Sequence, residues 1–334
     1  MVVVDGYGGY VPLYRVERDD VAAQTGGSAS GETAVPARDE NHVTMASEAA
    51  ETALARADAG AGDLGAVVSA SITDPFAEHG IAAHVAYRLQ ATGDVRTADL
   101  RSSGRAATDA LLTARDFVRA NDAPALVIAA DVLPAEAGDD DAATAGAGAG
   151  AVVLAPDAEG SAASLQGVGQ ATTGFVERHR RHGEPAEGGD AKFEGQHGFG
   201  PAVEQASGPA LAAVDGQPSL AVVAAANQRM ASSALRQFGD VDHVSTFDDV
   251  GAAGTASFYL DLVHLLETAD AGESAVALCY GAGGADAVTL ETGSGVGADA
   301  GLSVAEQVDA KEYVTYAKHL EYREPVDYQG VTVS

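Results

Sequence analysis

Short apolar runs alternate with longer alanine-rich segments along most of the chain. LGAVVSAS (64–71), ALVIAADV (125–132) and SLAVVAAAN (219–227) are apolar nearly throughout, which predicts strands buried on both faces. NHVTMASEAAETALARA (41–57) repeats apolar residues every three or four positions, which predicts an amphipathic helix. Further helices are expected at 81–89, 107–120, 231–239 and 254–269. Alternation of this kind is typical of an α/β fold.

The same order of elements occurs twice, and each half contains a central apolar helix, near 104–120 and 254–268. We therefore expect two similar halves packed as one unit. A polar, weakly patterned stretch from 169 to 200 separates them. The predicted organisation is an N-terminal half (1–165), an insertion (166–200), a C-terminal half (201–320) and a tail (321–334) that leads toward a further domain or a partner.

The charge of the chain excludes some classes of partner. The formal net charge is -30, and Lys192, Lys311 and Lys318 are the only lysines. Such a surface repels nucleic acid and anionic membranes. Dispersed acids, scarce lysine and small apolar residues resemble a cytoplasmic protein of a halophile, in which salt screens the repulsion. No apolar stretch approaches 18 residues and the start is not that of a signal peptide, so we expect a soluble, cytoplasmic protein.

The cysteine and the histidines of the polar stretch do not predict a disulfide or a metal site. Cys279 is the only cysteine and lies within the apolar run AVALCYG, so we interpret it as a small buried residue without a disulfide or a cysteine-based zinc site. His179, His182 and His197 lie in the polar stretch, beside arginines that disfavour a metal. No metal site is predicted.

Several motifs in a consistent order carry a family resemblance. They are GYGGYVPLYRV (6–16), TDPFA (73–77), ADLRSSGRAATDALLTA (98–114), VGAAGTAS (250–257), YGAGGADA (280–287) and KEYVTYAKHLEYRE (311–324). Together the motifs resemble the archaeal form of the 3-hydroxy-3-methylglutaryl-CoA (HMG-CoA) synthase branch of the thiolase superfamily. The resemblance implies the five-layer αβαβα thiolase fold, made of two pseudo-symmetric halves, and a homodimer.

That family joins two acyl-CoA thioesters with a cysteine that is acylated, a histidine that polarises a carbonyl and a glutamate that moves protons. The nucleophile lies at a helix N-terminus, where the helix dipole lowers its pKa. The resemblance places the cysteine position on Gly104, or on Ser103 if the register shifts by one residue. Ser102 and Ser103 are interpreted first as N-cap residues of the following helix, and Ser103 is the one candidate for a displaced nucleophile.

The other family positions also carry unexpected residues. The histidine position falls on Ala224 or Ala225, the glutamate position on or next to Ile72, and the asparagine of the Gly-Asn motif on Ala252. Alanine cannot polarise a carbonyl and glycine cannot be acylated, so the resemblance implies lost condensation activity. Candidate contacts to substrate or coenzyme A are Arg178, Arg180, Arg181, Asn227, Arg229, Gly281, Gly283 and Gly284.

Three functions remain open at this point. The first is a catalytically degenerate subunit that works beside a catalytic thiolase and a zinc-ribbon/OB-fold protein, the partners that the resemblance implies. The second is an active acyl-CoA condensing acyltransferase that uses Ser103. The third is a coenzyme A-binding module. A coenzyme A thioester is the expected ligand, and no other cofactor is predicted.

Overall fold

The structure is a computed structural model of the 334-residue chain. It describes residues 1–74, 76, 78–101, 103–134, 141–157, 159–176, 178–181, 187–225 and 227–323. Ser102, His182 and most of the predicted tail lie outside the described residues.

A ten-stranded mixed sheet forms the framework. From one edge to the other its strands are β12 (Asp242–His243), β11 (Leu220–Ala224), β13 (Ser274–Gly281), β14 (Gly284–Thr292), β8 (Ala163–Thr172), β1 (Val2–Tyr10), β7 (Ala147–Pro156), β6 (Ala125–Val132), β4 (Ala66–Ala70) and β5 (Arg96–Leu100). From either edge toward the centre, each half uses its strands in the chain order third, second, fourth, fifth, first. The predicted pseudo-symmetric halves are thus confirmed. They meet where β1 pairs with β8 at Val3–Ser164 and Val4–Ala163.

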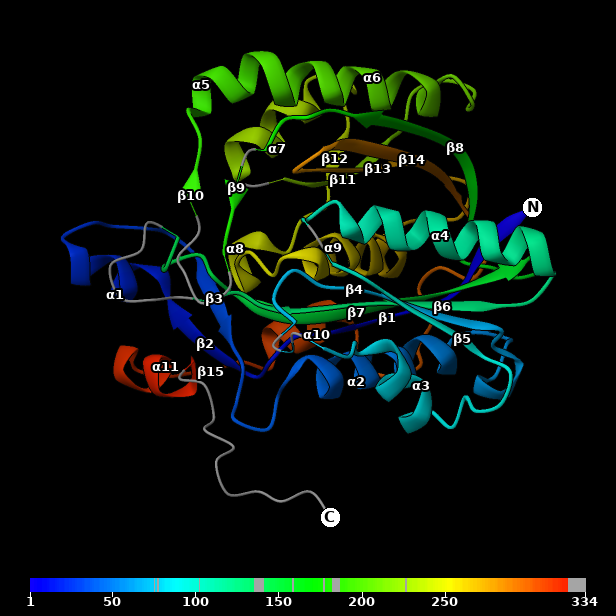
Figure 1. The fold of residues 1–334 in the computed structure, drawn as a ribbon, viewed down its shortest axis with the longest axis horizontal. Coiled ribbons are helices and arrows are strands. Elements are labelled where there is room, and N and C mark those ends of the chain that lie inside the picture. The colour runs from blue at the N-terminus through cyan, green and yellow to red at the C-terminus, as the bar shows by residue number, and fades with distance from the viewer. Residues whose placement is uncertain are drawn as a thin grey trace.

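Helices cover both half-sheets and fill the space between them. The long helices are α2 (His42–Ala55), α3 (Ala82–Arg88), α4 (Ala106–Asn121), α6 (Gly200–Leu211), α7 (Gln228–Leu235) and α9 (Thr255–Thr268). α2 and α3 pack on the N-terminal half-sheet, α6 and α7 pack on the C-terminal half-sheet, and α4 and α9 contact strands of both (Figure 1). These five layers are the predicted αβαβα fold.

Smaller elements decorate this framework. They are β2 (Tyr14–Glu17), α1 (Arg18–Ala22), β3 (Glu32–Val35), β9 (Arg178–His179), β10 (Glu187–Gly188), α5 (Ala191–Glu194), α8 (Phe247–Val250), α10 (Val304–Asp309), β15 (Glu312–Tyr313) and α11 (Tyr316–Arg323). The boundary predicted between residues 165 and 166 falls inside β8, so residues 166–172 belong to the sheet. Within 169–200, the structure also has β9, β10, α5 and a π-helical turn at Gly195–Phe199.

Small residues allow the outer helices to approach the sheet closely. A Cβ atom on Gly8 of β1 would lie 2.3 Å from the carbonyl oxygen of Ala49 in α2. A Cβ atom on Gly169 of β8 would lie 1.9 Å from the carbonyl oxygen of Ala206 in α6. Side chains cannot occupy either position without moving a helix. The glycine-rich composition therefore has the same packing role in both halves.

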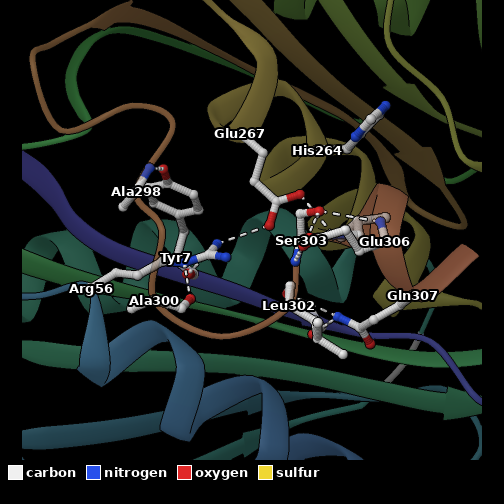
Figure 2. Close-up of polar contacts among 12 residues, drawn as sticks. Tyr7, Arg56, His264, Glu267, Ala298, Ala300, Leu302, Ser303, Glu306 and Gln307 are labelled. Carbon is white, nitrogen blue, oxygen red and sulfur yellow. Dashed lines mark hydrogen bonds and ion pairs between the residues drawn. The ribbon is translucent and has the colours of Figure 1, made fainter. Parts of the chain in front are cut away.

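A buried ion pair fastens the C-terminal segment to the N-terminal half (Figure 2). Arg56, the C-cap of α2, lies 2.8 Å from Glu267 of α9, and its Nε donates to the carbonyl of Ala300 at 2.7 Å. The second oxygen of Glu267 accepts from the amide of Val304, the first residue of α10, at 2.8 Å. The guanidinium also lies 4.9 Å above the ring of Tyr7. One cation thus ties β1, α2, α9 and α10 together, away from the cavity described next.

Among the described residues, no helix has the length and apolar character needed to cross a membrane.

Candidate functional site

The predicted chemical positions converge on one cavity of about 230 Å³. It lies where the two central helices begin, beside the ends of β11 and β13. Its lining includes every position that the resemblance assigns to chemistry: Ile72, Ser103, Gly104, Ala224, Ala225 and Ala252. The structure therefore brings these distant segments together, whereas the role of each residue stays a prediction.

The start of α4 differs from the sequence expectation. Ser103 is 8% exposed, and its hydroxyl donates to the carbonyl of Ala282 at 3.2 Å rather than accepting from a helix amide. The N-cap position belongs to Arg105, which caps with no side-chain hydrogen bond. The N-cap interpretation of Ser103 is therefore wrong. The physical reason is local: the carbonyls of Ser103 and Gly104 already accept the amides of Ala106 and Ala107, so the first turn closes through the backbone.

An ion pair from the other half holds this helix start. Arg105 Nε and Nη2 donate to the two carboxylate oxygens of Asp286 in β14, at 2.7 and 3.0 Å. Asp286 is fully buried and also accepts from Thr108 Oγ1 at 2.8 Å and Gln170 Nε2 at 3.1 Å. Hydrogen bonding to this carboxylate raises the pKa of the Arg105 guanidinium. The bidentate geometry fixes the direction in which α4 enters the cavity wall.

The start of α9 is held by a second buried carboxylate. Asp131, at the end of β6, accepts from the amide and the hydroxyl of Thr255 at 2.7 and 2.6 Å. Its other oxygen accepts from Ser71 Oγ, the amides of Ile72 and Thr73, and Thr73 Oγ1, at 2.6 to 2.8 Å. A carboxylate at a helix N-terminus is favoured by the helix dipole. Asp131 thus orders the loop that carries Ile72.

Of the positions assigned to histidine and to substrate contacts on this segment, Ala224, Ala225 and Asn227 line the cavity. Ala224 ends β11 and pairs with Cys279 of β13. Asn227 lines the cavity and caps α7, because its side chain accepts from the amide of Met230 at 3.0 Å. Arg229 is exposed and does not line the cavity.

The three glycines of the β13–β14 turn serve packing and do not line the cavity. A Cβ atom on Gly281 would lie 2.9 Å from the amide nitrogen of Arg105. Gly283 and Gly284 have φ values of +93° and +140°, and a Cβ atom on Gly284 would lie 1.7 Å from the carbonyl oxygen of Ala171. The turn therefore needs glycine in order to bring β14 against β8 and against the start of α4.

Two of the three predicted arginines lie at the cavity. Arg178 and Arg180 line it, with Arg178 in an ion pair with Asp141 at 3.0 Å and Arg180 donating to the carbonyl of Ile72 at 3.2 Å. Arg180 is exposed, so this side of the cavity meets solvent. Arg181 is exposed and does not line the cavity.

The remaining histidine candidates form no metal site in the part of the chain that the structure describes. His179 lies 3.6 Å from Glu187, and the ring of His197 lies 4.6 Å from that of Phe193. No group of three or more histidine, cysteine, aspartate or glutamate residues with suitable geometry occurs among the described residues.

Among the lining residues that were not predicted as site residues, Cys279 and Asp261 carry buried titratable groups. Cys279 is 1% exposed, and its thiol donates to the carbonyl of Gly104 at 3.2 Å. Asp261 of α9 is 4% exposed and accepts from the amide and the hydroxyl of Thr246, at 2.7 and 2.8 Å. Burial raises the pKa of the Asp261 carboxyl to about 7, although the hydrogen bonds from Thr246 lower it. An aspartate in the largely apolar run SFYLDLVHLL was the signal available in the sequence.

Comparisons with known proteins agree with this architecture. No family model matches the chain. Hydroxymethylglutaryl-CoA synthase of Methanopyrus kandleri is 28% identical over 347 residues, covering 98% of this chain and 98% of that protein. The protein of the same name from Methanobrevibacter smithii is 28% identical over 97% of this chain and 99% of its own length.

Solved structures match along most of the chain. An HMG-CoA synthase complexed with CoA gives a TM-score of 0.82 at 17% identity and covers 96% of this chain and 89% of its own. The 3-oxoacyl-[acyl-carrier-protein] synthase III of Aquifex aeolicus gives 0.76 at 19% identity, over 87% of this chain and 100% of its own. Together with the strand order, these matches define a thiolase-fold protein. Along nearly its whole length, the chain is also similar in sequence to proteins named hydroxymethylglutaryl-CoA synthase.

Proposed function

We propose that the chain binds a coenzyme A thioester in the central cavity. The full-length relatives carry the name of an enzyme of acyl-CoA chemistry, and one structural neighbour was solved with CoA. Arg178 and Arg180 supply positive charge on the solvent side, where the phosphates of the coenzyme would remain. Ser103 and Cys279 mark a buried end, which would receive the acyl group.

We further propose that this chain does not perform the condensation by itself. The observation that carries this proposal is the arrangement of the groups that line the cavity. The hydroxyl of Ser103 donates to the backbone carbonyl of Ala282, and no side-chain base accepts its proton among the described residues. Nucleophilic catalysis needs a base within hydrogen-bond reach of the nucleophile. Gly104 and Ala224 cannot fill either role.

A chain of this kind would act as a partner in an acyl-CoA-processing complex. β5 and β12 are the edge strands of the sheet, and uncovered edges favour pairing with another chain. We propose a homodimer, and a complex with a catalytic thiolase and a zinc-ribbon/OB-fold protein, as the resemblance implies.

An active acyl-CoA condensing acyltransferase is the second candidate. It is favoured by similarity over nearly the whole chain to proteins named as synthases. The Oγ of Ser103 would then take the acyl group from the thioester, whose C–S bond breaks, and coenzyme A would leave as the thiol with the serine proton. This step requires the Ser103 hydroxyl to turn away from Ala282.

Acyl transfer from radiolabelled acetyl-CoA separates the two candidates. The first predicts bound thioester but no label on the denatured protein. The second predicts label on Ser103 that is lost in Ser103→Ala. Ser232→Ala, which changes an exposed serine of α7, is the matched control. Stoichiometric label that survives in S232A and disappears in S103A would overturn the first candidate.

A further inference from the structure

Asp261 gives the buried end of the cavity a polar group that the condensation chemistry does not use. It projects from the second turn of α9 and lines the cavity while only 4% exposed. Among the ion pairs of the described residues, none includes Asp261. A carboxylate this buried and without a cation is costly unless hydrogen bonds compensate it.

The hydrogen bonds that the protein donates to the buried Asp261 carboxyl reach only one of its two oxygens. Both donors of Thr246, its amide and its hydroxyl, bond to Oδ1 of Asp261. No donor to Oδ2 occurs among the described residues. Thr246 is itself 5% exposed, so it holds the carboxyl group rigidly and leaves Oδ2 as the oxygen open to a ligand.

A second polar group lies on the same face of the helix. Ser257 precedes Asp261 by four residues, so both side chains lie on one side of α9, and both line the cavity. Ser257 Oγ accepts from the amide of Ala253 at 2.8 Å, which leaves its hydroxyl proton for another acceptor. The buried end thus offers one strong acceptor and one weaker donor.

The free oxygen of Asp261 favours some ligand groups and disfavours others. A hydroxyl or amide N–H would supply the hydrogen bond that Oδ2 lacks, and hydrogen bonds to a charged group are among the stronger ones. A ligand carboxylate would place a like charge beside Asp261 in a poorly hydrated site. Arg178 and Arg180 lie on the solvent side and belong to the part of the cavity that would hold the coenzyme.

We propose that Asp261 selects the acyl group, so that the cavity favours a thioester whose acyl chain carries a hydroxyl and disfavours one that ends in a carboxylate. This inference rests on the proposed binding of coenzyme A thioesters. It makes Asp261 a specificity-determining residue, and Thr246 the residue that positions it.

Three thioesters with four-carbon acyl groups test the inference by calorimetric titration of the full chain: 3-hydroxybutyryl-CoA, butyryl-CoA and succinyl-CoA. The titrations are done above pH 7, where Asp261, with its pKa of about 7, is ionised. The wild-type chain should bind the hydroxylated ester about tenfold more tightly than butyryl-CoA, and succinyl-CoA most weakly. Asp261→Leu should abolish the preference for the hydroxyl. Asp261→Asn removes the charge, keeps its oxygen on the two donors of Thr246 and turns its amide N–H toward the ligand. A ligand hydroxyl or carboxylate can accept from that N–H, so the variant should keep the preference for the hydroxyl and restore the binding of succinyl-CoA. Asp270→Asn, at an exposed position just after α9, is the charge-matched control and should behave as wild type.

The outcomes separate this inference from the function on which it rests. Equal affinity of the wild-type chain for the three esters, or an unchanged order in D261N, overturns the role of Asp261 while binding of coenzyme A stands. If coenzyme A and all three esters fail to bind, the proposed function is overturned and the inference with it. D261N is nearly isosteric, so it provides a test even if D261L does not fold.

Discussion

The two central helices begin at the same cavity, and each is anchored by a buried aspartate from the opposite half. Asp286 of the C-terminal half holds the start of α4, and Asp131 of the N-terminal half holds the start of α9. In both, a threonine hydroxyl near the helix start donates to the carboxylate, from Thr108 and Thr255. The two anchors differ in the charge of their partners. Asp286 pairs with the Arg105 cation, whereas among the described residues Asp131 accepts only from uncharged amide and hydroxyl groups.

This comparison shows which contacts fix the two helix starts that line the cavity. The polar contacts that set the helix starts are complete, while the positions assigned to chemistry carry Gly104, Ala224 and Ile72. The two aspartates therefore fix the geometry of the helix starts at the site.

The largest effect is expected from removing the charged anchor. Asp286→Ala would leave Arg105, whose side chain is 13% exposed, without its partner and should lower the free energy of unfolding by about 3–5 kcal/mol. Denaturant unfolding at constant high salt measures this. The double variant R105M/D286L, which removes both charges, should recover much of the loss. A loss below about 1 kcal/mol in D286A, the range of exposed pairs, would show that the ion pair does not anchor α4.

Removing the charge of Asp131, the anchor of α9 that has no cationic partner among the described residues, should lower the free energy of unfolding less. Asp131→Asn keeps the size of the side chain and leaves no cation unpaired, but it replaces one acceptor oxygen by a donor facing other donors. We expect a loss of about 1–3 kcal/mol, together with weaker binding of coenzyme A thioesters as the loop at Ile72 loosens. The same unfolding curves and a CoA titration give both values. A loss in D131N that exceeds that in D286A would reverse the comparison.

The pH dependence of stability should show the cost of burying Asp261. Its pKa is raised from 3.8 to about 7, so the folded chain holds a proton that the unfolded chain releases. The stability that this proton contributes is fully present below about pH 4 and is lost as the pH rises through about 7. Subtracting the profile of D261N from that of the wild-type chain between pH 5 and 8, the range that the two pKa values span, isolates this contribution. A flat difference would mean that Asp261 is ionised throughout, as an exposed aspartate would be.

Much of the framework could be predicted from the sequence because its signals are local. The apolar run of β6 and the periodicity of α2 and α9 identify buried elements without any tertiary information. β8 was divided by a predicted boundary because its buried face consists mainly of alanine and glycine, which give little hydrophobic contrast. Its strand character comes from pairing with β14 and β1.

The site was only partly predictable for a related reason. Motif order brought Gly104, Ala224 and Ala252 to one place, and the structure joins them at the cavity. The partners of Ser103 and Asp261 could not be read from the chain, because Ala282 and Thr246 approach them only after folding. Local rules therefore assigned a cap to Ser103 and no role to Asp261.

Native mass spectrometry of the chain mixed with acetyl-CoA tests the central claim most directly. The account predicts a complex whose added mass is that of the intact thioester and which returns to the bare chain on denaturation. The population of this complex should fall when free CoA is added as a competitor. An added mass of the acetyl group alone that persists after denaturation, or acetyl-CoA that never associates with the chain, would contradict it.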